Sequence, residues 1–320
     1  MSDSVSGSAG TLIEAPKSRG PVIAAVVVVL ALVVGAIVFA LTRGDDEGGA
    51  SSGPVVKIGV VGASDPYWET FKDAAADEGI TVDIIDFADY AQPNPALSEG
   101  ELDLNQFQHI IYLADYNVKN KDDLVALGST AIYPMGLYSS KVDSVEEIKD
   151  GDTVVVPDDE SNQARALLIL QSQGLIELED GGSIYSTVAD VDTGASKVKV
   201  KALKADLTPT SLPDVAAAFV NNDFVAKAGL KFSDAIAQDD PTDPSALPYV
   251  NIFAARAEDK DNETYLKLIE IYQDTKAVQD GVMEVSGDTA SLVKIPAADL
   301  ADSLAETEDA TRAAGGPEKD

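Results

Sequence analysis

The sequence contains no cysteine and a single histidine, and it is poor in basic residues: 23 Lys and Arg stand against 55 Asp and Glu, for a formal net charge of −32. The absence of cysteine excludes disulfides, thiolate metal sites, a thiol nucleophile and a lipid-modified N-terminal cysteine. One histidine cannot supply the paired imidazoles of many metal sites. The negative charge argues against binding to nucleic acid or anionic lipid headgroups, because both are held by basic patches.

One long uncharged run, residues 21–42, lies near the N-terminus. It is about as long as the roughly 20 residues that cross a bilayer as a helix. Basic residues precede it and acids follow Arg43 at once, so the positive-inside rule predicts a cytoplasmic tail at 1–20, an anchor at 21–42 and a flexible tether at 43–54. A cleaved signal peptide is the alternative, but the run exceeds the usual apolar region of about 7 to 15 residues. We therefore expect a single-pass membrane protein with an extracytoplasmic bulk.

The rest of the chain is long enough for two domains with separate cores, since 45% of the 320 residues are hydrophobic. Short runs rich in Val and Ile predict strands at 55–62, 81–87, 153–157, 198–203, 216–221 and 249–255. Amphipathic segments predict helices at 67–79, 161–174 and 262–282. This alternation predicts an α/β fold with mostly parallel sheets. The acidic, Ala-rich end, 301–320, predicts a disordered tail.

Polar and aromatic side chains gather where the expected strands end. Open parallel sheets bind ligands at the carboxyl ends of their strands, so these are the positions to inspect. They hold Asp89, Tyr90, Asn105, Phe107, Gln108, His109, Tyr112, Asp158, Asp159, Glu160, Ser161, Asn162, Arg165, Asn221 and Asn251.

Arg165 carries the clearest chemistry of this set. If its helix begins near Ser161, the free N–H groups and the positive end of the helix dipole face the carboxyl ends of the strands. Arg165 then lies one helical turn after Ser161, on the same face of the helix. Together they would form a carboxylate receptor. The alternative is a capped surface helix whose arginine pairs with a nearby acid, and spacing alone favours that alternative.

His109 lies between Phe107 and Tyr112 in the stretch DLNQFQHIIYL. It is either a general base or a packed, hydrogen-bonded side chain; a base needs a partner group that sequence cannot place. The chain lacks G-x-S-x-G and H-E-x-x-H motifs, and residues 59–64 match neither a P-loop nor a dinucleotide fingerprint. We expect no catalytic residue, no metal site and no cofactor.

The segments 87–113, 132–178, 219–222 and 248–252 resemble the NlpA lipoprotein family, the substrate-binding proteins of methionine-uptake ABC transporters. The pairing of F-x-D-Y-x-x-P-N with N-x-F-Q-H-x-x-Y-L is specific, and the resemblance covers about 56 to 285. It implies a two-lobed periplasmic-binding-protein-like type II fold behind the transmembrane helix. Residues 55–134 and 248–300 would form lobe I, and 135–247 lobe II.

The resemblance also implies a ligand and its contacts. A methionine side chain would lie among aromatic residues, where thioether contacts are favourable. Arg165 would hold the carboxylate, and Asn221 and Asn251 would fix the head group, with Asn162 and Asn105 as further contacts. The aromatic set is Phe87, Tyr90, Phe107, His109 and Tyr112. The partners would be L-methionine, a permease and an ATPase on separate chains, and the membrane through the chain's own helix, with no nucleic acid.

Several positions depart from the family pattern. The family attaches through a cysteine, which the uncharged run at 21–42 would replace. Asp223 and Phe224 are unusual, 239–249 is an insertion, and the segment around Trp68 is expected to open onto the cleft. Another apolar amino acid, the D-isomer or a methionyl dipeptide therefore stays open as the ligand. An enzyme on the same scaffold and a tethered sensory or scaffolding domain are the rival classes.

Overall fold

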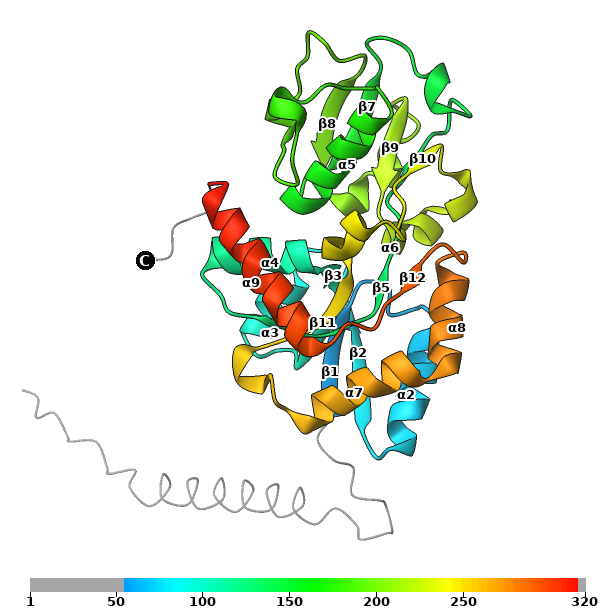
Figure 1. Cartoon of the computed structure of the whole chain (residues 1–320). Coiled ribbons are helices and arrows are strands. Elements are labelled where there is room, and N and C mark those ends of the chain that lie inside the picture. Colours follow the sequence, from blue (N-terminus) through cyan, green and yellow to red (C-terminus); the bar gives the residue numbers. More distant parts are fainter. Residues whose placement is uncertain (1–54, 316–320) are drawn as a thin grey trace, which may run out of the picture. The chain divides into compact units, whose positions relative to one another are not determined.

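The computed structural model describes residues 55–315 (Figure 1). The expected cytoplasmic tail, the anchor at 21–42 and the tether at 43–54 lie outside the described residues, as do residues 316–320. Between 55 and 315, no helix is both long enough and apolar enough to cross a membrane.

The first sheet has five strands in the order β2-β1-β3-β11-β4. They are β1 (Val55–Val60), β2 (Thr81–Asp86), β3 (Leu104–His109), β4 (Val125–Ser129) and β11 (Asn251–Ala255). β1 pairs in parallel with β2 and β3, whereas β11 is antiparallel to both β3 and β4. The expectation of mostly parallel sheets is therefore wrong here, because β11 returns from the second sheet and not through a helical crossover within the first. It is wrong for the second sheet as well, where half of the pairings are antiparallel.

Helices cover both faces of this sheet. They are α2 (Tyr67–Asp77), α3 (Pro93–Ser98), α4 (Ile110–Asn120), α7 (Glu263–Asp274) and α8 (Lys276–Val285). α2 ends where expected, and Gly79 follows it in the left-handed conformation (φ 78°) that glycine adopts without strain. The single helix expected at 262–282 is instead α7 and α8. They are separated by the extended residue Thr275 (φ −80°, ψ 106°), and the side chain of Gln279 caps the carbonyl of Gln273 that this break frees.

The second sheet has the strand order β10-β6-β9-β7-β8. Its strands are β6 (Gly136–Tyr138), β7 (Thr153–Pro157), β8 (Lys199–Leu203), β9 (Ala217–Val220) and β10 (Ala237–Gln238). β7 is parallel to both β8 and β9, and the other pairings are antiparallel. The long helix α5 (Glu160–Ser172) follows β7, and the short α6 (Asn222–Val225) follows β9. A separate two-stranded sheet joins β5 (Ala131–Ile132) to β12 (Ser291–Leu292).

Each five-stranded sheet has its own buried core. Trp68, Phe71 and Phe253 belong to the core of the first sheet, and Leu167 and Phe219 to that of the second. We call the two halves lobe I and lobe II; Figure 1 shows lobe II, with β7, β8 and α5, above lobe I. The chain passes from lobe I to lobe II between β5 and β6, and it returns between β10 and β11.

The described part of the range 301–320, which was expected to be disordered, is helical up to residue 313. α9 (Ala297–Ala313) packs on α4 and β4, and it buries Leu300 and Leu304 on one face. The side chain of Asn117 in α4 donates a 2.8 Å hydrogen bond to Glu308 of α9. Composition predicted disorder because acids and alanines dominate, but two leucines four residues apart are enough to attach an amphipathic helix.

Replacing Leu300 with Ala tests this attachment. Leu300 is 1% exposed, so Leu300→Ala removes buried side-chain volume and should lower the free energy of unfolding by about 2 to 4 kcal/mol. The measurement is urea denaturation followed by circular dichroism. Leu266→Ala, at a leucine of α7 that is 39% exposed, is the matched control with a small expected change. Equal losses in the two variants would contradict the packing of α9.

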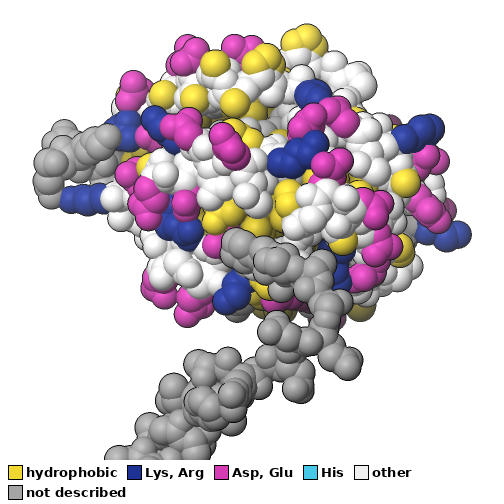
Figure 2. All heavy atoms as spheres, turned by 90° about the horizontal axis from the view of Figure 1, so that it is seen from below, with side chains coloured by type: hydrophobic (Ala, Val, Ile, Leu, Met, Phe, Trp, Pro, Cys, Tyr) yellow, Lys and Arg dark blue, Asp and Glu magenta, His cyan; other side chains and the backbone are white. Residues whose placement is uncertain are grey.

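The described surface carries charges of both signs. On the face drawn in Figure 2, Asp and Glu side chains are spread widely, and Lys and Arg side chains are scattered among them without gathering into one basic patch. Several lysines on the surface sit beside acids, as in the pairs Lys276–Asp280 (2.6 Å) and Lys294–Asp274 (2.7 Å). Exposed pairs of this kind contribute little to stability.

Candidate functional site

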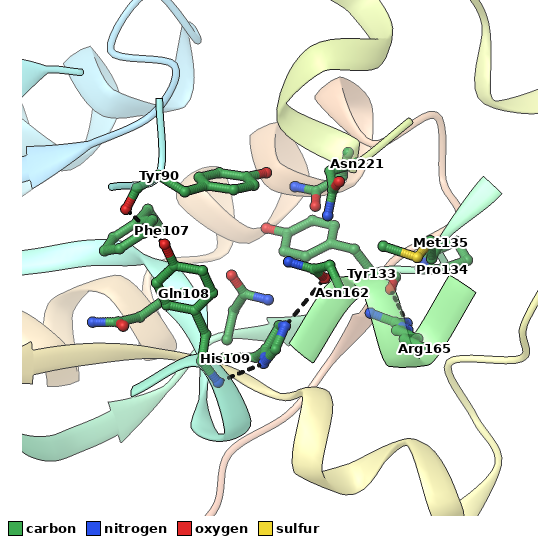
Figure 3. A pocket seen from close by; sticks show the side chains of 13 residues that line it. Tyr90, Phe107, Gln108, His109, Tyr133, Pro134, Met135, Asn162, Arg165 and Asn221 are labelled. Atoms are coloured by element: carbon green, nitrogen blue, oxygen red, sulfur yellow. Dashed lines mark hydrogen bonds between the residues drawn. The ribbon is translucent and has the colours of Figure 1, made fainter. Parts of the chain in front are cut away.

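A cavity lies between the two lobes, where the ends of β3, β11, β9 and the start of α5 meet the crossing between β5 and β6. Figure 3 shows side chains from these elements turned toward one another around it. The lining residues are Tyr90, Phe107, Gln108, His109, Tyr112, Tyr133, Pro134, Met135, Asn162, Arg165, Asn221, Asn222 and Asn251. Both lobes contribute to the wall, so the two must approach each other for the cavity to form.

All the residues expected to contact the ligand line this cavity except Phe87 and Asn105. Phe87 instead packs against the hydrophobic clusters on either side of the β2 end. Asn105 is fully buried two residues deeper in β3 than Phe107; it donates to Asn94 Oδ1 (2.8 Å) and accepts from Gln108 Nε2 (2.9 Å). Its amide is used to hold Gln108 in place and is not part of the wall.

The sequence reasoning missed part of the wall. Tyr133, Pro134 and Met135 belong to the crossing between the lobes, and Asn222 follows the predicted Asn221. Gln108 lies near the end of β3, as the sequence predicts, but it is not among the residues expected to contact the ligand. The chain must run past the cleft wherever it crosses between two lobes. The lobe boundary predicted at 134/135 therefore already indicated that Tyr133, Pro134 and Met135 would line the cavity.

Arg165 is held by the protein on one side and faces the cavity on the other. Its Nε donates to Asp239 Oδ2 (2.6 Å), Nη2 donates to the carbonyl of Tyr133 (2.8 Å), and the guanidinium lies 4.3 Å from the centroid of the Tyr249 ring. No partner for Nη1 is found among residues 55–315. The sequence spacing favoured an ion pair between Arg165 and an acid, and the structure has this pair with Asp239. The pair leaves N–H donors of the guanidinium group free.

The N-terminus of α5 is capped by Asp159 and not by Ser161. Asp159 Oδ1 accepts from the backbone N–H of Asn162 (3.0 Å) and from its side-chain amide (2.8 Å). Burial raises the pKa of the Asp159 carboxyl to about 6, although these hydrogen bonds act to lower it. The helix end that was expected to receive a ligand carboxylate is thus already occupied by a side chain of the protein.

His109 is a helix cap with a fixed role. Its Nδ1 accepts a hydrogen bond from the backbone N–H of Tyr112 (3.2 Å) at the start of α4, which leaves the proton on Nε2, 3.3 Å from Asn162 Oδ1 across the lobes. Burial, with the charge of Arg165, lowers the pKa of His109 to about 3. A neutral imidazole whose lone pair is already bound cannot serve as a general base at neutral pH.

The depressed pKa of His109 predicts a specific loss of stability in acid. The unfolded chain takes up the proton below about pH 6.5, whereas the folded protein does not until about pH 3, so stability falls as the pH decreases from 6.5. Between pH 7.5 and 5, wild type should lose about 2 kcal/mol more than His109→Gln, which cannot titrate. Urea denaturation at the two pH values measures the difference, and parallel pH profiles would refute the assignment.

Aromatic rings form one wall of the cavity. Tyr90 lies 5.8 Å from Phe107 and 6.2 Å from Tyr112 between ring centroids, and 5.1 Å from Phe224 of lobe II. The hydroxyl of Tyr112 donates to the backbone carbonyl of Tyr90 (2.9 Å), which holds the Tyr112 ring in place. This wall offers a slot for an apolar or thioether side chain.

Two amides at the cavity, Asn221 of lobe II and Asn251 of lobe I, have free hydrogen-bonding capacity. The Oδ1 of Asn221 is buried and has no partner among the described residues, and it lies at the cavity. Asn251 also lines the cavity, and no hydrogen bond of its side chain is found in this part of the chain. A buried, unpaired acceptor favours a ligand that brings a donor to it. Within residues 55–315, no group of three or more His, Asp or Glu side chains is arranged to hold a metal ion.

The sequence of this chain is similar to a known protein family and to curated members of known name. The model of the family described as NlpA lipoprotein matches residues 56–292. The chain belongs to the NlpA lipoprotein family. It is 40% identical to the D-methionine-binding lipoprotein MetQ of Escherichia coli K12, over 68% of this chain and 81% of that protein. It is 35% identical to a probable D-methionine-binding lipoprotein MetQ of Haemophilus influenzae, over 78% of this chain and 91% of that protein.

Solved structures of similar proteins have the same mixed α/β fold. The substrate-binding protein of a methionine transporter from Streptococcus pneumoniae matches with a TM-score of 0.70 at 33% identity, covering 78% of this chain and 99% of its own. A nutrient-binding protein from Burkholderia cenocepacia bound to methionine matches with a TM-score of 0.69 at 36% identity, covering 74% and 99%. The family match ends at residue 292, so α9 lies beyond it.

The departures from the NlpA family pattern now have places in the fold. Trp68 is 1% exposed in the core of lobe I, 5.9 Å from Phe71 and 5.8 Å from Tyr272, so the expectation that it opens onto the cleft is wrong. Trp68 and Phe71 are three residues apart on the face of α2 that meets the sheet. The segment 239–249, which was expected to be an insertion, supplies Asp239 and Tyr249, and both contact Arg165.

Proposed function

We propose that this protein is the membrane-anchored, extracytoplasmic substrate-binding component of an ABC importer, which binds methionine between its lobes and delivers it to a permease. The proposed fold is of the periplasmic-binding-protein type II, with lobe I at 55–134 and 248–300 and lobe II at 135–247. The observation that carries the proposal is the interlobe cavity, which combines an aromatic wall, a guanidinium with free donors and two amides with unused capacity. The methionine-binding relatives support the choice of ligand.

The proposed pose follows from the chemistry of each wall. The ligand carboxylate accepts from the free donors of Arg165, and the ammonium group donates to Asn221 Oδ1. Asn251 contacts the same head group. The thioether lies against Phe107 and the neighbouring tyrosine rings, where sulfur–aromatic contacts are favourable.

Binding without turnover fits this wall. A reaction would need a nucleophile activated by a base, and the imidazole of His109 is occupied as a helix cap. The D-isomer, another apolar amino acid and a methionyl dipeptide present the same carboxylate to Arg165, so they belong in the test panel.

Anchoring is proposed through the chain's own N-terminal segment. Relatives are named lipoproteins, whereas this sequence has no cysteine that could carry a lipid, and its uncharged run at 21–42 is of spanning length. A single-pass anchor would keep the binding lobes outside the membrane, close to a permease whose ATPase is a separate cytoplasmic chain.

Titration calorimetry of the full-length chain tests the function. The protein is unfolded and refolded to remove bound ligand, and it is then titrated with L-methionine, D-methionine, leucine, glutamine and glycyl-methionine. We expect one-to-one binding of methionine, weakened in Asn251→Ala and unchanged in Asn120→Ala, which alters an exposed amide of α4. If only another compound of the panel gives binding heat, that compound replaces methionine as the proposed ligand. No heat from folded protein would overturn the proposal in favour of a tethered sensory or scaffolding domain.

A further inference from the structure

One hydrogen bond joins the lobes directly beside the cavity. The hydroxyl of Tyr90, in the loop after β2 of lobe I, donates to Asp223 Oδ2 in α6 of lobe II at 2.8 Å. The ring of Tyr90 also packs 5.1 Å from the ring of Phe224, the residue after Asp223. Tyr90 is 8% exposed, so this contact is made away from bulk solvent. Opening of the lobes must break the hydrogen bond and return the carboxyl group of Asp223 to water.

Asp223 lines a second cavity that adjoins the first at Tyr133 and Asn222. Its Oδ1 accepts from Asn222 Nδ2 (2.6 Å). The charged groups that face it are Lys227, which follows α6, and Asp65, which precedes α2. The phenols of Tyr67, Tyr133 and Tyr272 face it from α2, the crossing and α7. No cation among residues 55–315 forms an ion pair with this carboxyl group.

We propose that Asp223 and Tyr90 form a latch that couples closure of the lobes to the uptake of a proton, so that the closed, ligand-holding state is favoured in mildly acidic medium. Asp223 acts as a positioning residue, because it touches Tyr90 and not the ligand. This inference rests on the proposed function, since the closed state is the state that would hold methionine.

The sign of the coupling follows from burial. Burial between the lobes raises the pKa of Asp223 to about 7, against the opposing effects of the Tyr90 hydrogen bond and of Lys227. In an open protein the carboxyl group meets water and keeps a pKa near the ordinary value for aspartate, about 3.9. The closed state therefore binds more protons, and closure becomes more favourable as the pH falls from 8 toward 4. The ligand should bind about tenfold more tightly at pH 6 than at pH 8.

Other buried groups titrate outside most of this interval. The pKa of His109 is lowered to about 3, and those of Asp115 and Asp159 are raised by burial only to about 6. The change in affinity between pH 8 and 6.5 should therefore come mainly from Asp223. The variant Asp223→Asn keeps an acceptor for the hydroxyl of Tyr90, but its side chain cannot ionise.

The first test measures methionine affinity of the full-length chain by calorimetry from pH 6 to 8. We expect the tenfold dependence in wild type and in Asp214→Asn, an exposed aspartate of lobe II, and an almost flat profile in Asp223→Asn. Tyr90→Phe, which leaves the carboxyl group without its donor, should bind more weakly at pH 8 than at pH 6 by an even larger factor. A wild-type profile that is flat, or one that Asp223→Asn does not change, would overturn the latch while leaving methionine binding established.

The second test needs no ligand and separates failure of the latch from failure of the proposed function. Because the chain lacks cysteine, Glu179→Cys in lobe II and Glu270→Cys in lobe I place two spin labels specifically, both at exposed positions. We expect the population with the shorter label distance to grow between pH 8 and 6, and the growth to disappear when Asp223→Asn is added. A distance distribution that is independent of pH would refute the latch, whatever the protein binds.

Discussion

Replacing Arg165 with Ala should remove most of the ligand affinity. The change deletes the donors proposed for the ligand carboxylate inside a desolvated cavity, and truncating one partner of such a buried charge pair costs about 2 to 5 kcal/mol. Calorimetric titration with methionine at pH 7 measures the loss. Arg165→Lys should recover only part of it, since an ammonium group cannot donate to Asp239, Tyr133 and the ligand in the same fixed geometry.

Stability must be separated from binding in this variant, because Arg165 also holds the protein together. Its removal leaves the carboxylate of Asp239 without its 2.6 Å partner beside the crossing. Asp239→Asn removes the same ion pair but keeps the guanidinium, so it should lose less affinity than Arg165→Ala. Lys276→Ala, which removes an exposed ion pair on α8, is the neutral control. Unchanged methionine affinity in a folded Arg165→Ala protein would contradict the proposed pose.

Replacing Trp68 with Ala should have the largest effect on stability and little effect on the ligand. Trp68 is 1% exposed and packs in a cluster with Tyr67, Phe71 and Tyr272, with ring centroids 4.7 to 5.9 Å away. Removing so large a buried ring typically costs about 3 to 5 kcal/mol. Urea denaturation followed by circular dichroism gives the loss, and calorimetry at low temperature gives the affinity of the folded fraction.

The matched variant for Trp68 is Trp68→Phe, which keeps an aromatic ring in the cluster and should lose less stability than the alanine variant. Both variants should bind methionine with the wild-type affinity as long as they are folded, because Trp68 lies within lobe I and not on the cavity wall. A drop in affinity at preserved stability would place this segment at the cleft after all.

Periodicity predicted only part of the secondary structure of the described chain: β1, β2, β7, β8, β9, β11, α2 and α5, but not β3, β4 or α4. The apolar runs at 55–62 and 153–157 are β1 and β7, because period-two or continuous Val and Ile patterns are local properties. The break at Thr275 and the helix α9 were missed for different reasons. The helix α9 depends on distant partners, because its leucines pack on α4 and β4, whereas the break at Thr275 is accompanied by a local cap from Gln279 that the helical periodicity of 262–282 does not reveal.

The sequence by itself determined the α/β class, the family and the set of side chains at the strand ends. Only the tertiary structure decided which of those side chains remain available to a ligand. The side chain of Asn105 is hydrogen-bonded to Asn94 and Gln108, and the Nδ1 of His109 accepts from the backbone at the start of α4. Asn221, in contrast, has an unpaired oxygen at the cavity. Hydrogen-bond partners such as Arg165 and Asp239 lie 74 residues apart, and no local pattern encodes a contact that exists only once lobe II is folded.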